Sequence, residues 1–414
     1  MAQTLSFTNA FLKQQYEGGI ADVVNQRVPL YARLKKTIKE FNSAAGIDLT
    51  YKFPMKTQIN QGVGNRAAAG VLPTAGQFKG QQASVAMKYG YGRCQFEGQA
   101  IAGGSVPSVA FGETLKMGLD DIEESIILDF ERQIQGDGSG FLGQISTTGN
   151  NTVTFTVTAP DTRWLYPGMI VDAYTAKSSG SEVAAEVTIA DVNEETSKIT
   201  TSAAVTMNDG NYLFRGDASA DPRNKDLIGL MGMVDDGTVL DTYQGITRTT
   251  AGNNFNKGRL VSGAAGAITQ IMIWGAAQKS WTGIFAGAGD STVGLCDPLS
   301  MTYVAKLLTA NERFVDTKEF TTGWKTLRFQ IGGKAIEFIE DQKAYPGYIY
   351  FLNEKNMEFA FAKGAHFEFM DRDNSILHYV PNYDAYEAIM FWYGNLACRI
   401  PYGNVRLYNY TAPS

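Results

Sequence analysis

The chain has 414 residues, of which 44% are hydrophobic and 12% aromatic, a composition that can bury more than one core and excludes a disordered polymer. The formal net charge of −6 argues against a sequence-specific reader of nucleic acid, although it allows a container of nucleic acid. Three widely separated cysteines and the lack of a membrane-length apolar run predict a soluble protein of a reducing cytoplasm, with no membrane partner.

The sequence lacks the residue patterns that most enzyme classes need. Acid–base, nucleophilic and zinc chemistry relies on histidine, and the two histidines, His366 and His378, are expected to be structural. Residues 62–67 match the dinucleotide-binding pattern formally, but no buried strand precedes them and no long helix can follow. Residues 371–374 resemble the start of a calcium loop without its glycine and glutamate. We therefore predict no enzyme, no cofactor and no metal site.

Residues 1–49 open with a predicted helix from Thr8 or Asn9 through Gln15 and close in the most basic short stretch of the chain. The basic side chains of that stretch are Arg27, Arg33, Lys35, Lys36 and Lys39. They indicate either a solvated helix face or a surface that meets phosphate or a neighbouring subunit.

Residues 50–105 are rich in glycine and basic side chains and poor in large apolar ones. They hold ten glycines, six basic residues and a single acid, Glu97. The stretch from Ala83 to Tyr89 alternates between small or polar and larger apolar residues, which predicts a strand. A segment this long with so little to bury cannot fold as a domain. We therefore predict a long two-stranded extension that is ordered only by contact with other copies.

The clearest predicted helix covers residues 108–135, with Ser108 as its cap and the glycine-rich residues 136–140 as its end. One stripe gathers the apolar side chains Phe111, Leu115, Leu119, Ile122, Ile126, Phe130 and Ile134. The opposite face, which we expect to be in water, gathers the acids Glu113, Asp120, Glu124 and Glu131. We interpret this helix as a structural beam.

Residues 142–216 change to a period of two. The predicted strands are residues 152–158, 182–192, 198–206 and 212–215. Glycine- and asparagine-rich stretches flank this segment, so we predict a small all-β domain, a barrel or a sandwich, inserted into a larger one. After it, the predicted helices are residues 268–279 and 298–311, and the predicted strands are residues 327–340, 349–361, 385–399 and 405–410. The predicted fold class is α+β.

This order of parts resembles the major capsid proteins of tailed bacteriophages, which have the Hong Kong 97-type fold. The resemblance covers the whole chain except 142–216. The stretches that carry it are GVGNRA at 62–67, LPTAG at 72–76, YGYGR at 89–93, GQAI at 98–101 and FWYGNLACR at 391–399. Some members of this family cross-link a loop lysine to a neighbour, but nothing in the sequence marks Lys56, Lys79 or Lys88 as reactive.

The resemblance implies a domain plan and a function. The plan is an N-terminal arm at 1–49, an extended loop at 50–105, a spine helix and peripheral domain at 106–141, a β insertion domain at 142–216, a mainly axial domain at 217–326, peripheral strands at 327–361, further axial domain at 362–384, and C-terminal peripheral or axial strands at 385–414. The implied function is self-assembly as pentamers and hexamers into the icosahedral head shell around the double-stranded DNA of a tailed phage.

The implied partners are further copies of the chain, portal and scaffolding proteins, a decoration protein, and packaged DNA held without sequence specificity. The implied location is the virion, after assembly in the host cytoplasm. Two alternatives stay open. One is an encapsulin-like nanocompartment shell protein, and the other is an unrelated enzyme or carbohydrate-binding protein that uses the β domain.

Charge counts predict a subunit interface. Residues 50–105 carry six bases against one acid, near +5, and residues 108–135 carry seven acids against two bases, near −5. The resemblance implies that the loop lies over a neighbouring subunit, so we expect its bases to face helix acids of another copy. The expected bases are Arg66, Lys79, Lys88 and Arg93, and the expected acids are Glu113, Asp120, Glu124 and Glu131.

Overall fold

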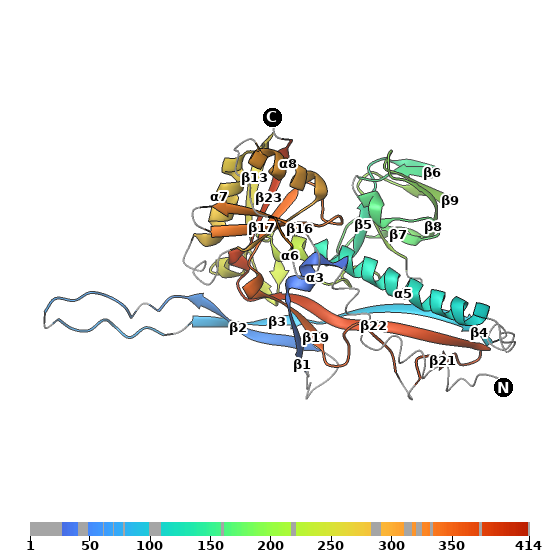
Figure 1. Ribbon diagram of the computed structural model, residues 1–414, viewed down its shortest axis with the longest axis horizontal. Helices are drawn as coiled ribbons and strands as arrows, with labels where there is room; N and C mark the ends of the chain where they lie inside the picture. The colour runs from blue at the N-terminus through green and yellow to red at the C-terminus, as the bar shows by residue number, and fades with distance from the viewer. Residues whose placement is uncertain are drawn as a thin grey trace. The chain divides into compact units, whose positions relative to one another are not determined.

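The computed structural model describes residues 27–39, 49–60, 62–68, 70–77, 79–98, 109–158, 161–216, 221–282, 291–309, 317–319, 325–331, 334–371 and 375–412, and side chains are described for most of them. The chain divides into two compact units (Figure 1). One unit combines Met1–Asp129 with Met233–Ser414, and the other is Phe130–Gly232. The helix predicted near the N-terminus lies outside the described residues.

The first unit contains a six-stranded sheet. Its strands are β1 (Lys35–Lys39), β4 (Lys88–Glu97), β19 (Met357–Ala362), β20 (Glu368–Phe369), β21 (His378–Tyr379) and β22 (Ala385–Cys398). The edge strand β1 runs parallel to β19, whereas β22 pairs antiparallel with β4 along most of its length (Figure 1). Predicted strand 385–399 is thus confirmed as β22.

The basic stretch near the N-terminus differs from the expected helix face. It forms the short helix α3 (Pro29–Arg33) and then β1. The nearly buried Arg33 pairs with Glu337 at 2.9 Å. Arg27 pairs with Glu124 at 2.9 Å. Acids of the same chain therefore hold at least two of these bases.

The long helix α5 (Val109–Gln135) confirms the prediction for 108–135, and the described part of its apolar stripe is buried. It lies close to the sheet because glycine replaces larger residues at the contact. A Cβ atom on Gly92 of β4 would come within 2.9 Å of Ile122, and one on Gly118 within 2.9 Å of Phe96. The side chains of residues 109–115 lie outside the described part of the chain.

The acidic face of α5 is in water only in part. Glu124 is exposed, but Glu131 is 8% exposed, so the expectation that it faces solvent is wrong. The physical reason is that the last turn of α5 belongs to the second unit. There Arg132 pairs with Asp226 at 2.7 Å, and the Leu227 amide donates to the Gln133 side chain at 3.1 Å.

A seven-stranded sheet forms the rest of the first unit's core. In sheet order its strands are β13 (Arg259–Ala267), β23 (Val405–Thr411), β18 (Tyr348–Leu352), β14 (Val293–Cys296), β17 (Lys334–Glu340), β16 (Lys325–Ile331) and β15 (Thr317–Glu319). The helices α7 (Gln270–Trp281) and α8 (Pro298–Thr309) pack on it through a shared apolar cluster, and both were predicted from the sequence.

The expected grouping of segments differs from the sheet pairing in two places. Strands β16, β17 and β18, which were expected beside the long helix, pair within the seven-stranded sheet. Conversely, residues 362–384 contribute β20 and β21 to the six-stranded sheet. The predicted strand 349–361 is also divided, because a 3-10 turn at Glu354–Asn356 separates β18 from β19. Alternating apolar residues indicate a strand but not its partner.

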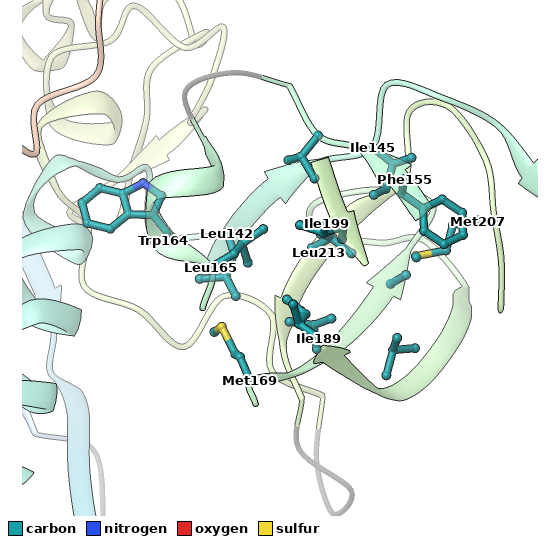
Figure 2. Packing of buried hydrophobic residues seen from close by; sticks show 14 residues of the cluster. Leu142, Ile145, Phe155, Trp164, Leu165, Met169, Ile189, Ile199, Met207 and Leu213 are labelled. Atoms are coloured by element: carbon teal, nitrogen blue, oxygen red, sulfur yellow. The ribbon is translucent and has the colours of Figure 1, made fainter. Parts of the chain in front are cut away.

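The second unit holds the predicted all-β domain, and of the two alternatives it is a barrel. Its strands are β5 (Phe141–Gln144), β6 (Gly149–Thr156), β7 (Ile170–Tyr174), β8 (Glu182–Asn193), β9 (Lys198–Met207) and β10 (Tyr212–Arg215), paired antiparallel in the order β5-β10-β7-β8-β9-β6. A bridge between Ile145 and Val157 joins the two ends of this order. Figure 2 shows the enclosed core, which includes Phe155, Ile189 and Leu213.

Candidate functional site: the extended hairpin and its anchorage

The strands β2 (Thr50–Gln58) and β3 (Lys79–Ala86) form the predicted two-stranded extension (Figure 1). They pair antiparallel, and residues 59–78 connect them. In the described part of this connection three apolar side chains are almost fully in water: Val63 is 87% exposed, Val71 86% and Leu72 83%. The formal dinucleotide-binding pattern at 62–67 lies here, in irregular chain with no helix among residues 62–68.

The base of this hairpin has a core of its own. Alternate side chains of β2 and β3, with Met87, are buried against residues from three other segments. The cluster contains Tyr51, Phe53, Met55, Ala83, Val85, Met87, Ile246, Phe255, Ala360 and Ala397. The expectation that 50–105 has too little to bury is therefore wrong for the base, because its apolar residues pack against distant parts of the same chain.

The carboxylate of Glu358 joins the hairpin to the body of the first unit. It accepts hydrogen bonds from Tyr51 Oη at 2.6 Å, Thr37 Oγ1 at 2.8 Å and Arg399 Nη2 at 3.0 Å. Burial alone would raise the pKa of Glu358, but these hydrogen bonds and the charge of Arg399 together lower it. Burial and the neighbouring carboxylate raise the pKa of Tyr51 to about 12. The ionised carboxylate of Glu358 is thus hydrogen-bonded to β1, to β2 and to the residue that follows β22.

A tight turn holds the other strand of the hairpin. It connects β11 (Thr242–Tyr243) with β12 (Ile246–Thr247). The Ser84 amide of β3 donates to the Gln244 carbonyl oxygen at 2.9 Å, and Gln244 Nε2 donates to the Cys398 carbonyl oxygen at 2.9 Å. Gln244 therefore connects β3 with the end of β22.

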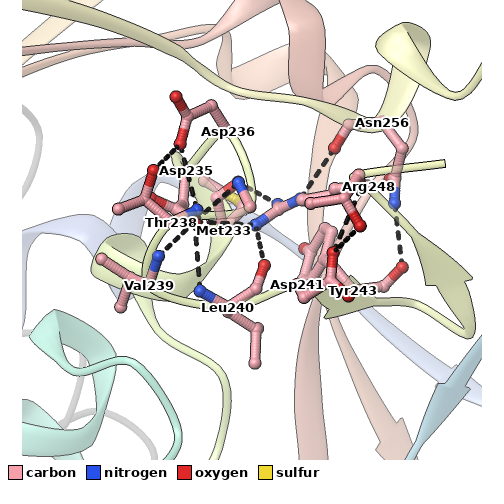
Figure 3. Close-up of polar contacts among 12 residues, drawn as sticks. Met233, Asp235, Asp236, Thr238, Val239, Leu240, Asp241, Tyr243, Arg248 and Asn256 are labelled. Carbon is pink, nitrogen blue, oxygen red and sulfur yellow. Dashed lines mark hydrogen bonds and ion pairs between the residues drawn. The ribbon is translucent and has the colours of Figure 1, made fainter. Parts of the chain in front are cut away.

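A buried polar network fixes the segment that carries this turn (Figure 3). The guanidinium of Arg248 is fully buried and donates to the carbonyl oxygens of Met233 at 2.6 Å, Asn256 at 3.0 Å and Leu240 at 3.2 Å. Its ion-pair partner is Asp235, at 3.8 Å. Burial lowers the pKa of Arg248. Asn256 Nδ2 in turn donates to the Tyr243 carbonyl oxygen at 2.9 Å. Asn256 thus connects the Arg248 network to Tyr243, the residue before the turn.

The structure places the predicted interface bases in different environments. Among the hairpin bases, Arg66 and Lys79 are exposed. Arg93 pairs with Glu387 at 2.6 Å, because β4 and β22 place these two side chains on neighbouring positions of one sheet face. Lys88 begins β4 and is half-buried.

Of the predicted helix acids, Asp120 and Glu124 are exposed, and Glu124 already pairs with Arg27. Glu131 is buried, and the side chain of Glu113 lies outside the described part of the chain. The helix therefore offers two of the four predicted acids at its described surface.

Both histidines make structural contacts. Tyr31 Oη and His366 Nε2 share a hydrogen bond of 2.5 Å, and burial lowers the pKa of His366 to about 4, so the ring is neutral near pH 7. His378 Nε2 donates to the Met370 carbonyl oxygen at 2.8 Å. Within the described ranges, no three His, Cys, Asp or Glu side chains are placed to hold a metal ion, and no helix is long and apolar enough to span a membrane.

No protein-family model and no curated protein matches the sequence. Among solved structures, the chain is similar to a chain of the cyanophage A-1(L) capsid asymmetric unit. The TM-score is 0.53 at 13% identity, over 94% of this chain and 93% of that chain. The chain has the Hong Kong 97-type capsid fold.

Two further solved structures match over nearly the full length of the chain. A chain of the satellite phage P4 procapsid matches with a TM-score of 0.42 at 9% identity, over 100% of this chain and 99% of that chain. The SrpI encapsulin of Synechococcus elongatus PCC 7942 matches with a TM-score of 0.43 at 9% identity, over 94% of this chain and 90% of that chain.

Sequence reasoning missed the residues that anchor the hairpin. Gln244 and Gly245 stand between two β-favouring pairs, and this spacing could have indicated a two-residue hairpin turn. No local signal marks Glu358, whose partners Thr37 and Tyr51 lie 321 and 307 residues away in the sequence.

Proposed function

We propose that this protein is a shell subunit that self-assembles into closed icosahedral particles, and specifically the major capsid protein of a tailed phage. The observation that carries the proposal is the near-full-length likeness to a chain of the cyanophage capsid, with a TM-score of 0.53. The absence of an enzymatic role is part of the same proposal, since the fold is that of a structural shell component.

The hairpin supports the assembly part of this proposal. Its base is fixed by a core and by the Glu358 carboxylate, so the connecting segment is presented from a firm support. That segment exposes Val63, Val71 and Leu72 to water, which is unfavourable for an isolated subunit. Contact with another copy would remove these side chains from water.

The proposed ion pairs between hairpin bases and α5 acids of neighbouring copies now involve fewer residues. Arg66, Lys79 and Lys88 of one copy face Asp120, Glu124 and Glu113 of another, and Glu131 drops out because it is buried. Arg93 and Glu124 contribute less, since Glu387 and Arg27 of their own chain already pair with them. Each exposed pair would add about 0–1 kcal/mol and would be screened by salt, so the pairs set register more than affinity.

The remaining parts of the proposal follow from the shell role. Such a subunit would meet portal, scaffolding and decoration proteins, and it would surround DNA without reading its sequence. A net charge of −6 agrees with a container that does not bind DNA tightly. Its location would be the phage head, assembled in the host cytoplasm.

Negative-stain electron microscopy of the expressed protein tests the assembly proposal. We expect closed particles from the full chain. A variant in which residues 59–78 are replaced by Asn-Gly should keep the hairpin base and its thermal transition but form no closed particles. Normal shells from this variant would refute a role of the connecting segment in assembly.

The nature of the cargo separates the phage capsid from the nanocompartment. Particles from the natural source are treated with nuclease, opened and analysed for DNA and protein. Genome-length DNA with little enclosed protein supports the phage capsid, whereas an enclosed enzyme without DNA supports the encapsulin-like alternative.

A further inference from the structure

The turn against the hairpin has an unusual first residue. Gln244 has φ of +54° and Gly245 has φ of +73°, and these two residues alone separate the paired Tyr243 and Ile246. Two-residue turns with both φ angles positive favour asparagine, aspartate or glycine at the first position. A glutamine in the left-handed region is sterically disfavoured, so its backbone conformation does not explain its presence.

The side chain of Gln244 is also only half satisfied. It is 4% exposed, and Nε2 donates to the Cys398 carbonyl oxygen, but Oε1 is buried without a hydrogen-bond partner. Buried polar atoms are normally paired, and an unpaired one lowers stability. Two unfavourable features thus accompany the hydrogen bond from Gln244 to Cys398, which indicates that this bond serves placement rather than stability.

The contacts of the turn show what would be placed. The Gln244 carbonyl oxygen accepts from the Ser84 amide of β3, and a Cβ atom on Gly245 would lie 3.4 Å from Ser84 Cβ. The next residue, Ile246, belongs to the core of the hairpin base. Asn256 Nδ2 donates to the carbonyl oxygens of Tyr243 and Ile246, the residues on either side of the turn. The buried Arg248 donates in turn to the Asn256 carbonyl oxygen (Figure 3). The turn therefore lies between β3 and the end of β22 and is hydrogen-bonded to both.

We propose that Gln244 is a positioning residue that fixes the direction in which the β2–β3 hairpin leaves the body of the subunit. The amide reaches from the turn to the Cys398 carbonyl oxygen, while the turn's backbone holds Ser84. In a shell, this direction sets the angle between neighbouring subunits and hence the curvature. This consequence for curvature rests on the proposed shell function, whereas the direction of the hairpin is a property of the single subunit.

The decisive variant is Gln244→Asn. Asparagine adopts the left-handed region more readily, but its amide is one methylene shorter and cannot reach Cys398. We expect the thermal midpoint to stay unchanged or to rise. In the unassembled subunit, hydrogen exchange at the Ser84–Ala86 amides should accelerate about tenfold, because one hydrogen bond that holds the turn is lost. Electron microscopy should show open or irregular particles in place of a uniform population.

Asn409→Gly is the matched control, since Asn409 also has a positive φ, of +55°, but lies on β23. It should leave both hairpin exchange and particle shape unchanged. Unchanged exchange and uniform particles for Gln244→Asn would overturn the proposal. So would a fall in the thermal midpoint with faster exchange throughout the subunit, since that marks a merely structural residue. If the wild-type protein forms no particles, the proposed function fails, and the exchange measurement still decides the role of Gln244.

Discussion

The two ends of the β2–β3 hairpin are built on opposite principles. At the base, Tyr51, Phe53 and Met55 are buried in a core shared with distant segments, whereas at the tip Val63 and Leu72 are almost fully exposed. The base is a product of folding within the chain, and the tip has no such support. The difference shows that packing within the chain can direct a surface offered for assembly even though apolar side chains at its outer end are exposed.

Removing a base side chain should have the largest effect on the subunit. Phe53→Ala leaves a cavity among the core residues of the base, and we expect a loss of about 3 kcal/mol in the free energy of unfolding. Urea unfolding measures the loss, with Val63→Ala at the tip as the control that should change nothing. Equal stability losses for the two variants would contradict the division of the hairpin into base and tip.

Removing the charge of Glu358, which connects the hairpin base to the body of the unit, should have the second-largest effect on stability. Glu358→Gln keeps the shape but removes the charge that meets Arg399 and mismatches one of the donors, so we expect a loss of about 1–3 kcal/mol. The lowered pKa gives this contribution a pH window: it is present above about pH 4.3, the ordinary glutamate pKa, and is lost as the pH falls below that value. Chemical unfolding at pH 7 and pH 3 measures both, and Glu195→Gln, at an exposed position of the second unit, is the control. Identical pH profiles for the wild type and Glu358→Gln would show that the carboxylate contributes nothing.

A smaller effect on stability is expected from His366, which is hydrogen-bonded to Tyr31. The pKa of His366 falls to about 4 in the folded chain from an ordinary value of about 6.5, so the unfolded state binds more protons between these values. Stability should therefore decline by about 1 kcal/mol as the pH falls from about 6.5 to 4, after allowance for solvent screening. Thermal midpoints across this window measure the decline. His366→Gln should flatten it and His378→Gln should not. A wild-type profile that is already flat would show that burial does not lower the pKa of His366 in the folded chain.

The smallest effect on the free energy of unfolding is expected at the tip. A substitution there should reduce assembly without reducing stability. Leu72→Ser replaces a side chain that contacts little within the chain, so the free energy of unfolding should change by less than about 0.5 kcal/mol. Particle yield should nevertheless drop sharply, as measured by sedimentation. Thr74→Ser, at a neighbouring exposed position, should assemble normally. Full particle yield from Leu72→Ser would mean that the tip stays in water after assembly.

Local patterns predicted the elements of this fold but not how they associate. The stripe that includes Leu119, Ile122 and Ile126 predicted α5 because a helix repeats every 3.6 residues. The alternation around residues 198–206 predicted β9 in the same way. Neither pattern contains information on which strands pair, and so the placement of β16–β18 was missed.

The error at the hairpin base has the same origin. Tyr51, Phe53 and Val85 looked too few to form a core because their partners, such as Ile246 and Ala397, lie far away in the sequence. The charge pattern of α5 failed at Glu131 for a related reason, since the last turn of α5 belongs to the second unit, where Gln133 accepts from the Leu227 amide, 94 residues further along the chain. What a single chain buries is decided by contacts that a local window does not contain.

The closed β-barrel of the second unit has a consequence for crowding. An open sheet presents edge strands with unpaired amide and carbonyl groups, to which another chain can add a strand. Here the bridge between Ile145 and Val157 closes the order of strands, and the Ser146 amide donates to the Thr156 carbonyl oxygen at 2.9 Å across that closure. Wherever many copies of this chain are held side by side, their barrels can touch repeatedly without templating fibre-like association.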